Sequence, residues 1–210
     1  WDRLATYLAD QGITLNSDPA PRQFSSGFGN LNYLISVDGQ MRVLRRPPMG
    51  SVQPGSNDMG RESRILMRLW RAFPLAPRCH HFCNDPSILG ARFLIMEYRR
   101  GMVIGGTMPD GLPANAGLGL GRMLAEQLAA FHAVDPAAID LDTLGNTNGY
   151  LARTLKGWTK RAVAAWDGDA PPALATLADW LGSRLIADAP ATLIHNDFKL
   201  DNVILNPDTL

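Results

Sequence analysis

Residues 195–202 read His-Asn-Asp-Phe-Lys-Leu-Asp-Asn, and they are the most informative stretch of the chain. Two short apolar runs frame them: residues 192–194 read Thr-Leu-Ile and residues 203–205 read Val-Ile-Leu. Short runs rich in branched residues predict buried strands, so we expect a polar loop held at both ends. Catalytic side chains commonly lie on loops that a rigid scaffold holds in this way.

The side chains of this loop suit phosphoryl transfer. Asp197 offers a carboxylate that can accept the proton of an attacking hydroxyl, and Lys199 places a cation two residues later. Asn202 adds a carboxamide oxygen, a ligand type that Mg²⁺ accepts. The alternative is an ordinary polar turn that contains these residue types, because the pattern fixes only a few positions.

The loop resembles the catalytic loop of the protein-kinase-like superfamily, whose pattern is H-R-D-L-x-x-x-N. Its second residue is Asn196 in place of Arg, which is similar to the aminoglycoside phosphotransferase and choline kinase branch, whose members phosphorylate small molecules. The resemblance implies a two-lobed α+β fold. Residues 1–98 would form a nucleotide-binding lobe, an antiparallel sheet with one helix. Residues 99–210 would form a mainly helical catalytic lobe, with ATP between the two.

The composition is that of a soluble globular protein. The chain has 210 residues, 46% hydrophobic and 19% charged, which is enough to bury a core. Its 20 basic residues balance 20 acidic ones, so charge gives no reason to expect nucleic acid or an anionic membrane as a partner. No apolar run approaches the ~20 residues of a membrane span, and the first residues do not resemble a signal peptide. We therefore expect a cytoplasmic protein with no nucleic-acid or membrane partner.

Both cysteines lie in one segment, residues 79–83, which reads Cys-His-His-Phe-Cys. These residue types also occur in metal sites, but the segment has the pattern of a strand. A strand would place Cys79 and Cys83 about 13 Å apart, which is too far for a disulfide and awkward for one tetrahedral ion. We therefore expect two reduced cysteines, as is usual in the cytosol, and not a metal centre.

The first lobe is predicted to contain a loop of small residues between strands. Residues 24–30 read Phe-Ser-Ser-Gly-Phe-Gly-Asn and lead into an alternating run at 31–37, which is typical of a strand. Asp38-Gly39 predicts a hairpin turn into a returning strand. Backbone N–H groups of the loop can approach phosphate oxygens, although a Gly-x-Gly pattern alone is more often a flexible turn. The resemblance implies nucleotide binding by Ser26, Gly27, Phe28 and Gly29.

A strand cation and a helix carboxylate form a second candidate pair. Arg45 resembles the ATP-anchoring lysine of the kinase V-A-I-K strand, and Val43 on the same strand face would cover adenine. Glu62 lies in the apolar stripe of a helix predicted over residues 57–73, where a buried carboxylate needs a partner. The resemblance makes Arg45 and Glu62 the ion pair that positions ATP. Alternatively, Arg45 is solvated at a strand end and Glu62 is wet at the edge of the stripe.

Residues 91–98 predict a buried strand that ends in Met-Glu-Tyr. By resemblance this strand end is the hinge between the lobes, where backbone groups around Glu97 and Arg99 would hydrogen-bond adenine. Apolar residues at helical spacing predict a short helix over residues 1–10 and three helices in the second lobe. These three are expected near residues 120–134, 151–166 and 174–185, with their Leu and Trp stripes in the core.

Several segments resemble one subgroup, the phosphotransferase domains found alone or fused to acyl-CoA dehydrogenases. They are Arg45-Arg46-Pro47-Pro48, residues 58–62, Gly149-Tyr150 and residues 157–161. The resemblance implies an ATP-dependent O-phosphotransferase for a small molecule, which this subgroup suggests is a hydroxylated acyl compound. Asp197 would act as the base, Lys199 would offset charge on the γ-phosphoryl group, and Asn202 would hold Mg²⁺. The implied partner is an acyl-CoA dehydrogenase domain.

The resemblance also calls for a second metal ligand, an Asp that would follow the turn at residues 206–208, whereas the sequence stops at Leu210. We therefore expect the sequence to be truncated at its C-terminus, and this 210-residue piece to be inactive or nearly so. Two other functions stay open. One is a nucleotide-binding pseudokinase that serves as a scaffold, and the other is a non-catalytic module docked to a fused acyl-CoA dehydrogenase.

Overall fold

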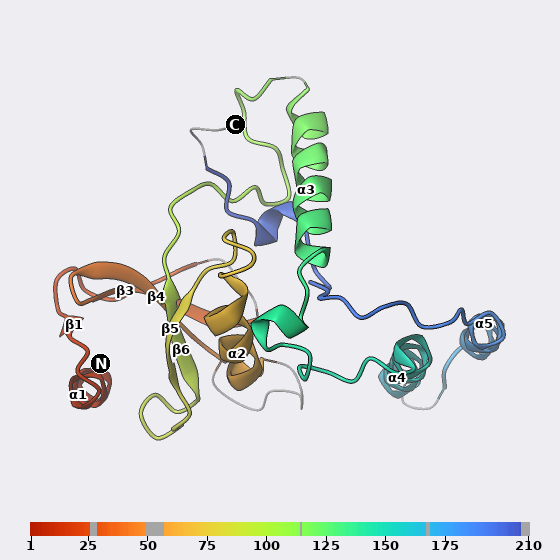
Figure 1. The fold of residues 1–210 in the computed structure, drawn as a ribbon, viewed down its shortest axis with the longest axis horizontal. Helices are drawn as coiled ribbons and strands as arrows, with labels where there is room; N and C mark the ends of the chain where they lie inside the picture. Colours follow the sequence, from red (N-terminus) through yellow and green to blue (C-terminus); the bar gives the residue numbers. More distant parts are fainter. Residues whose placement is uncertain (26–28, 49–56, 114, 167–168, 207–210) are drawn as a thin grey trace. The chain divides into compact units, whose positions relative to one another are not determined.

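A computed structural model of the chain describes residues 1–25, 29–48, 57–113, 115–166 and 169–206 (Figure 1). The chain divides into two compact units. The first unit comprises Trp1–Leu141 and Leu193–Leu210, and the second comprises Asp142–Thr192. Because this division follows packing along the chain, it does not test the lobe boundary at residue 98, which stays a prediction.

An antiparallel sheet forms the first part of the first unit (Figure 1). Its strands run in the order β1-β3-β4-β6-β5, and β2 pairs with β3. The Asp38-Gly39 turn joins β3 to β4 with both residues at positive φ, 49° and 73°, which confirms the predicted hairpin. The strands are β1 (Leu15–Asn16), β2 (Arg22–Gln23), β3 (Leu31–Val37), β4 (Gln40–Arg46), β5 (Cys79–Cys83) and β6 (Phe93–Glu97).

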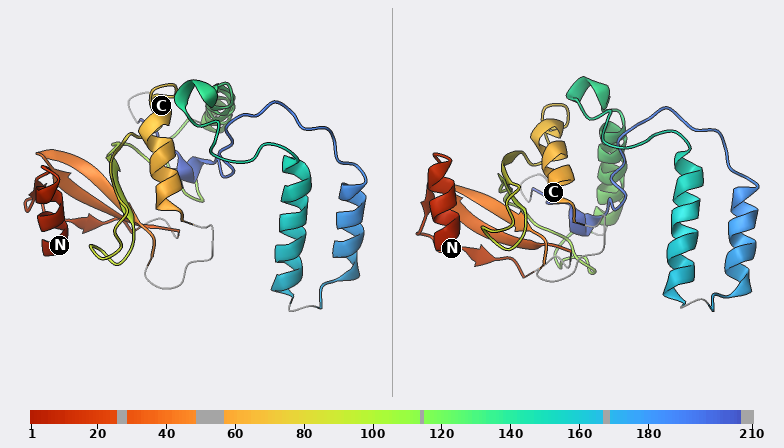
Figure 2. Two further views of the ribbon diagram at one scale, coloured as in Figure 1. Left: turned by 60° about the horizontal axis from the view of Figure 1, so that its bottom comes forward. Right: turned by 90° about the horizontal axis from the view of Figure 1, so that it is seen from below.

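Two helices cover opposite faces of this sheet (Figure 2). Helix α1 (Asp2–Asp10) buries Leu4 and Leu8 completely, against a cluster that includes Leu44 of β4. Burial of each such leucine stabilises the fold by about 1.5–3 kcal/mol. Successive side chains of a strand alternate between faces, so Val43 and Arg45 lie on the face opposite Leu44.

Helix α2 (Met59–Leu69) packs on that second face. Its buried Met59 contacts Cys79 and Leu94 in one apolar cluster. The helix begins after Asp58, whose carboxylate accepts a hydrogen bond from the Arg61 N–H at 3.1 Å and so caps the first turn. The helix is therefore shorter at both ends than the predicted 57–73. The two cysteines of β5 are free and buried, on a strand as predicted.

The second part of the first unit contains α3 (Ala116–His132) and the short 3₁₀ helices η1 (Ala137–Ile139) and η2 (Leu200–Asn202). Leu205 forms a small buried cluster with Ile104 and Leu120, and it pairs with Met102 in an isolated antiparallel bridge. The prediction of buried strands at residues 192–194 and 203–205 is wrong. Of these six residues, all of which the structure describes, only Leu205 pairs with another segment as in a sheet. Ile194 and Ile204 are 43% and 50% exposed. A strand needs a neighbour for its backbone groups, and short apolar runs do not reveal whether one exists.

The second unit is a pair of helices, α4 (Tyr150–Ala165) and α5 (Pro172–Gly182), that lie side by side (Figure 2). Both helices occur where the sequence predicts them, but neither contains a buried residue. Trp158, Trp166 and Trp180 are at least half exposed, so the expectation that these stripes are core is wrong for the structure described. Within this unit, each helix can cover only one side of the other. Among the described residues, no helix is long and apolar enough to cross a membrane.

Candidate active site

The structure brings Asp197, Lys199 and Asn202 together in one loop. Lys199 Nζ lies 3.3 Å from Asp197 Oδ1. The Asn202 side chain donates from Nδ2 to both the Asp197 carboxylate, at 2.8 Å, and the Asp197 backbone carbonyl, at 2.9 Å. The 3₁₀ turn of η2 supplies the reversal that returns Asn202 to Asp197. The carboxylate is therefore held on both oxygens.

These contacts within the loop also determine which side-chain atoms can still bind a ligand. Because the Asn202 nitrogen is used, its Oδ1 is the atom that can meet a cation, which is the ligand type that Mg²⁺ accepts. Lys199 also lies 3.4 Å from Asp201 Oδ2. The hydrogen bond with Asp197 and the charges of Asp197 and Asp201 raise the pKa of Lys199, so it stays a cation at neutral pH. All of these side chains are exposed, which leaves the loop open to substrates.

Two residues that secure this loop were not predicted. Asn196 has a φ of 66°, the left-handed conformation that Asn adopts more readily than most residues, so an Asn at this position was the available signal. The His195 ring lies edge-on to Phe198 at 5.4 Å and to Phe131 of α3 at 6.3 Å, between ring centroids. Phe131 in turn meets Phe73, just after α2, at 5.6 Å. Aromatic contacts thus connect the loop to α3 and to the end of the helix that carries Glu62.

The predicted pairing of Arg45 with Glu62 is present. Arg45 Nε lies 3.1 Å from Glu62 Oε1, which joins β4 to α2 on the same sheet face as the buried Val43. The side chains of Arg45 and Glu62 are 32% and 26% exposed, so the pair is partly open to water. Burial raises the pKa of Glu62, and the positive charge of Arg45 opposes that rise only in part.

Asn30 is a further contact of Arg45 that the sequence did not reveal. In the amide orientation that satisfies both of its polar groups, the Asn30 side-chain oxygen accepts hydrogen bonds from Arg45 Nε at 3.1 Å and Nη2 at 2.9 Å. Asn57 donates to the Gly29 carbonyl at 2.7 Å. These bonds tie the end of the glycine loop to β4 and to the start of α2. The predicted nucleotide contacts Ser26, Gly27 and Phe28 lie outside the described residues.

The predicted hinge residues form an ion pair of their own. Arg99 Nε lies 2.9 Å from Glu97 Oε1, and its Nη2 donates to Glu97 Oε2 at 3.0 Å. The Glu97 backbone N–H donates to the carbonyl of Arg78, the residue before β5, at 2.8 Å. Contacts to adenine would therefore fall to other backbone groups around Glu97 and Arg99, and that role stays a prediction.

Comparison with known protein families identifies the family of this chain. The family model described as Phosphotransferase enzyme family matches residues 21–210. The chain belongs to this phosphotransferase family.

The curated relatives of this phosphotransferase domain are much longer proteins. Acyl-CoA dehydrogenase family member 10 of Mus musculus is 33% identical over 208 residues, which cover 99% of this chain and 19% of that protein. Acyl-CoA dehydrogenase family member 11 of Homo sapiens is 31% identical over 206 residues, which cover 97% of this chain and 26% of that protein. The chain thus spans about a fifth to a quarter of these relatives, and the predicted resemblance to the subgroup associated with acyl-CoA dehydrogenases is confirmed.

Solved structures confirm the predicted α+β, protein-kinase-like fold of the phosphotransferase domain. A candidate aminoglycoside phosphotransferase from Ralstonia eutropha superposes with a TM-score of 0.78 at 27% identity, over 98% of this chain and 60% of that one. An aminoglycoside phosphotransferase solved with GDP and kanamycin superposes with a TM-score of 0.63 at 19% identity, over 99% of this chain and 67% of that one. The second likeness concerns the fold alone.

The raised pKa of Glu62 predicts how stability depends on pH. A carboxyl whose pKa is higher in the folded than in the unfolded state holds its proton more tightly when folded, so ionisation destabilises the fold. The stability that protonated Glu62 contributes is fully present below the ordinary glutamate pKa, and it is lost as the pH rises through the raised pKa of Glu62. We therefore expect Glu62→Gln, which has no proton to lose, to gain stability relative to the wild type as the pH is raised from 4 to 8.

Thermal denaturation of the wild-type protein and of the Glu62→Gln variant across this pH range measures the effect. The exposed Glu126 of α3 provides the control, because Glu126→Gln removes the same charge without touching Arg45. A Tm difference between wild type and Glu62→Gln that stays constant with pH would show that the environment of Glu62 does not disfavour its charge.

Proposed function

We propose that this phosphotransferase domain transfers the γ-phosphoryl group of ATP to a hydroxyl group of a small molecule. Family membership and fold support a kinase-type phosphotransferase. The observation that carries the finer assignment is the constraint on Asp197, whose two carboxylate oxygens face Lys199 and Asn202. A carboxylate fixed in this way can orient a hydroxyl and accept its proton.

In the proposed reaction the acceptor oxygen attacks the γ-phosphorus. The bond from that phosphorus to the β,γ-bridging oxygen breaks, ADP leaves, and the hydroxyl proton passes to Asp197. Lys199 lies beside Asp197 and offsets negative charge that builds on the transferring group. The Asn202 Oδ1 suits Mg²⁺, which when bound neutralises phosphate charge.

The nucleotide end of the site rests on the first part of the chain. Arg45 is oriented by Glu62 and Asn30, and it would meet the α- and β-phosphates with its remaining donors. Val43 would cover the adenine, and Ser26, Gly27, Phe28 and Gly29 would approach the phosphates. Glu97 and Arg99 would lie at the edge of the adenine pocket.

The acceptor is proposed to be a hydroxylated acyl compound, with an acyl-CoA dehydrogenase domain as the partner in a cytoplasmic protein. The names and lengths of the curated relatives support this choice, since they are acyl-CoA dehydrogenase family members. A non-catalytic module docked to such a dehydrogenase is the second candidate. The exposed tryptophans of α4 and α5 favour it, because they offer an apolar surface to a partner.

Nucleotide binding tests the proposed function directly. In the full-length protein, Arg45→Gln is expected to weaken binding of a non-hydrolysable ATP analogue with Mg²⁺ by about tenfold or more, because a charged donor to phosphate is lost. Isothermal titration calorimetry measures the Kd. Arg3→Gln on α1 is the charge-matched control, because Arg3 is exposed and lies on the helix that covers the other sheet face.

Equal affinity in the Arg45→Gln and Arg3→Gln variants would contradict the assignment of Arg45. Detection of a phosphorylated acyl compound by ³¹P NMR would favour the phosphotransferase over the non-catalytic module. Tight nucleotide binding without transfer to any hydroxylated acyl compound would favour the module.

A further inference from the structure

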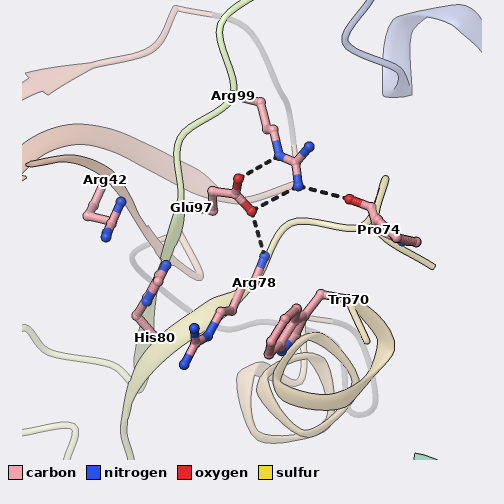
Figure 3. A pocket seen from close by; sticks show the side chains of 7 residues that line it. All are labelled: Arg42, Trp70, Pro74, Arg78, His80, Glu97 and Arg99. Atoms are coloured by element: carbon pink, nitrogen blue, oxygen red, sulfur yellow. Dashed lines mark hydrogen bonds and ion pairs between the residues drawn. The ribbon is translucent and has the colours of Figure 1, made fainter. Parts of the chain in front are cut away.

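A cavity of about 420 Å³ lies beside the predicted hinge (Figure 3). Arg42 of β4, His80 of β5 and Glu97 of β6 line it from the sheet, and Trp70 lines it from the end of α2. Arg78 and Arg99 complete the polar lining. This volume is within the range of small-molecule sites.

The cavity borders the predicted hinge, because Glu97 and Arg99 line it, but it does not include Val43 or Arg45 of the proposed nucleotide site. Arg42 is the cross-strand neighbour of Glu97, and both side chains line the cavity. Because side chains alternate along β4, Arg42 points to the opposite face of the sheet from Val43 and Arg45. The cavity also borders Trp70 at the end of α2, but neither Arg45 nor Glu62 is among the residues that line it.

The lining has an excess of positive charge. Three arginines face a single carboxylate, and that carboxylate is already bound: Glu97 accepts from Arg99 and also from the Arg78 backbone N–H at 3.2 Å. Figure 3 shows these bonds converging on Glu97. Glu97 thus balances Arg99, and two guanidinium charges remain.

Those two guanidinium groups have no carboxylate partner among the residues that the structure describes. In the part of the chain that the structure describes, Arg42 donates to its neighbours on β4, the Gln40 side chain and, at 3.4 Å, the Met41 carbonyl. The Arg78 guanidinium lies over the Trp70 ring, 4.8 Å from its centroid. An aromatic face attracts the cation but leaves its in-plane N–H donors unused.

The His80 imidazole between them responds to this charge. Burial lowers the pKa of His80, the charges of Arg42 and Arg78 lower it further, and Glu97 opposes them. His80 is therefore neutral at neutral pH and adds a ring N–H donor without needing an anion of its own.

We propose that this cavity binds the phosphate group of a small ligand. A phosphate dianion matches the two unbalanced guanidinium charges, whereas a single carboxylate would leave one of them unpaired. The fork of N–H donors on Arg42 and Arg78 suits phosphate oxygens better than a point charge would. The proposal does not depend on the transfer reaction.

Binding of inorganic phosphate to the 210-residue chain tests the proposal, with the His80 ring signals in ¹H–¹⁵N spectra as the readout. The signals are assigned with a His80→Gln variant, and the nucleotide site is saturated throughout with a non-hydrolysable ATP analogue and Mg²⁺. Bound phosphate offsets the arginine charges, so the pKa of His80 is expected to rise. In Arg42→Gln/Arg78→Gln, the phosphate concentration at half-saturation should increase at least tenfold.

Arg3→Gln/Arg122→Gln is the control, because both arginines are exposed and the change in net charge is the same. Circular dichroism establishes that each variant is folded. The proposal is overturned if phosphate leaves the His80 signals unchanged, or if chloride at equal ionic strength reproduces the effect. It is also overturned if the two double variants respond alike.

Discussion

Asp197→Asn in the full-length protein is expected to lower kcat for phosphoryl transfer by about 10²–10⁴-fold while leaving the Kd for nucleotide nearly unchanged. The amide oxygen can still accept the hydrogen bond from Asn202, but the amide nitrogen cannot accept from Lys199 and the side chain cannot take a proton. Steady-state transfer to an acyl acceptor and calorimetric titration with nucleotide measure the two quantities separately.

The neighbouring carboxylate supplies a matched control. Asp201 also lies close to Lys199, at 3.4 Å, and Asp201→Asn removes the same charge from the same loop. We expect Asp201→Asn to retain most of the turnover, because the proposed reaction gives Asp201 no proton to accept. If both substitutions reduced kcat equally, charge near Lys199 and not proton transfer to Asp197 would account for the loss.

The local parts of the site could be predicted from sequence because they depend on short spacings. Asp197 and Asn202 are five residues apart, and one 3₁₀ turn brings them together. The pairing of Arg45 with Glu62 joins distant residues, yet it was predictable because a carboxylate in an apolar helix stripe needs a cation. Their catalytic and nucleotide-binding roles remain proposals.

The parts that sequence reasoning missed depend on contacts between distant segments. Asn30 approaches Arg45 only because β3 and β4 are in a particular register, in which Asn32 pairs with Arg45. The cavity lined by Arg42, Arg78 and Arg99 also depends on distant contacts. Its side chains come from three strands and from the end of α2, so no local sequence pattern predicts it. The prediction of strands beside residues 195–202 was wrong for the same reason, since strand pairing depends on two segments and not on one.

Gly101 shows the same dependence on a distant segment, and it leads to the second large effect. A Cβ atom built at Gly101 would lie 2.5 Å from Ile204 Cγ2 and even closer to the Leu205 carbonyl oxygen. That carbonyl accepts from the Met102 N–H at 2.8 Å, and the Leu205 N–H donates back to Met102 at 2.8 Å. Only glycine lets these two segments approach so closely.

We therefore expect Gly101→Ala to lower the free energy of unfolding by about 1–3 kcal/mol, the usual result of forcing atoms into a packed contact. In thermal denaturation the Tm should fall by several degrees. Gly105→Ala is the control, because no atom lies within 4 Å of a Cβ built there. Because Leu205 closely follows the proposed catalytic loop, loosening this bridge should also reduce turnover in the full-length protein. If Gly101→Ala matched Gly105→Ala in Tm, the Leu205 segment would be free to shift at no cost, and the bridge could not be what holds Asp197 in place.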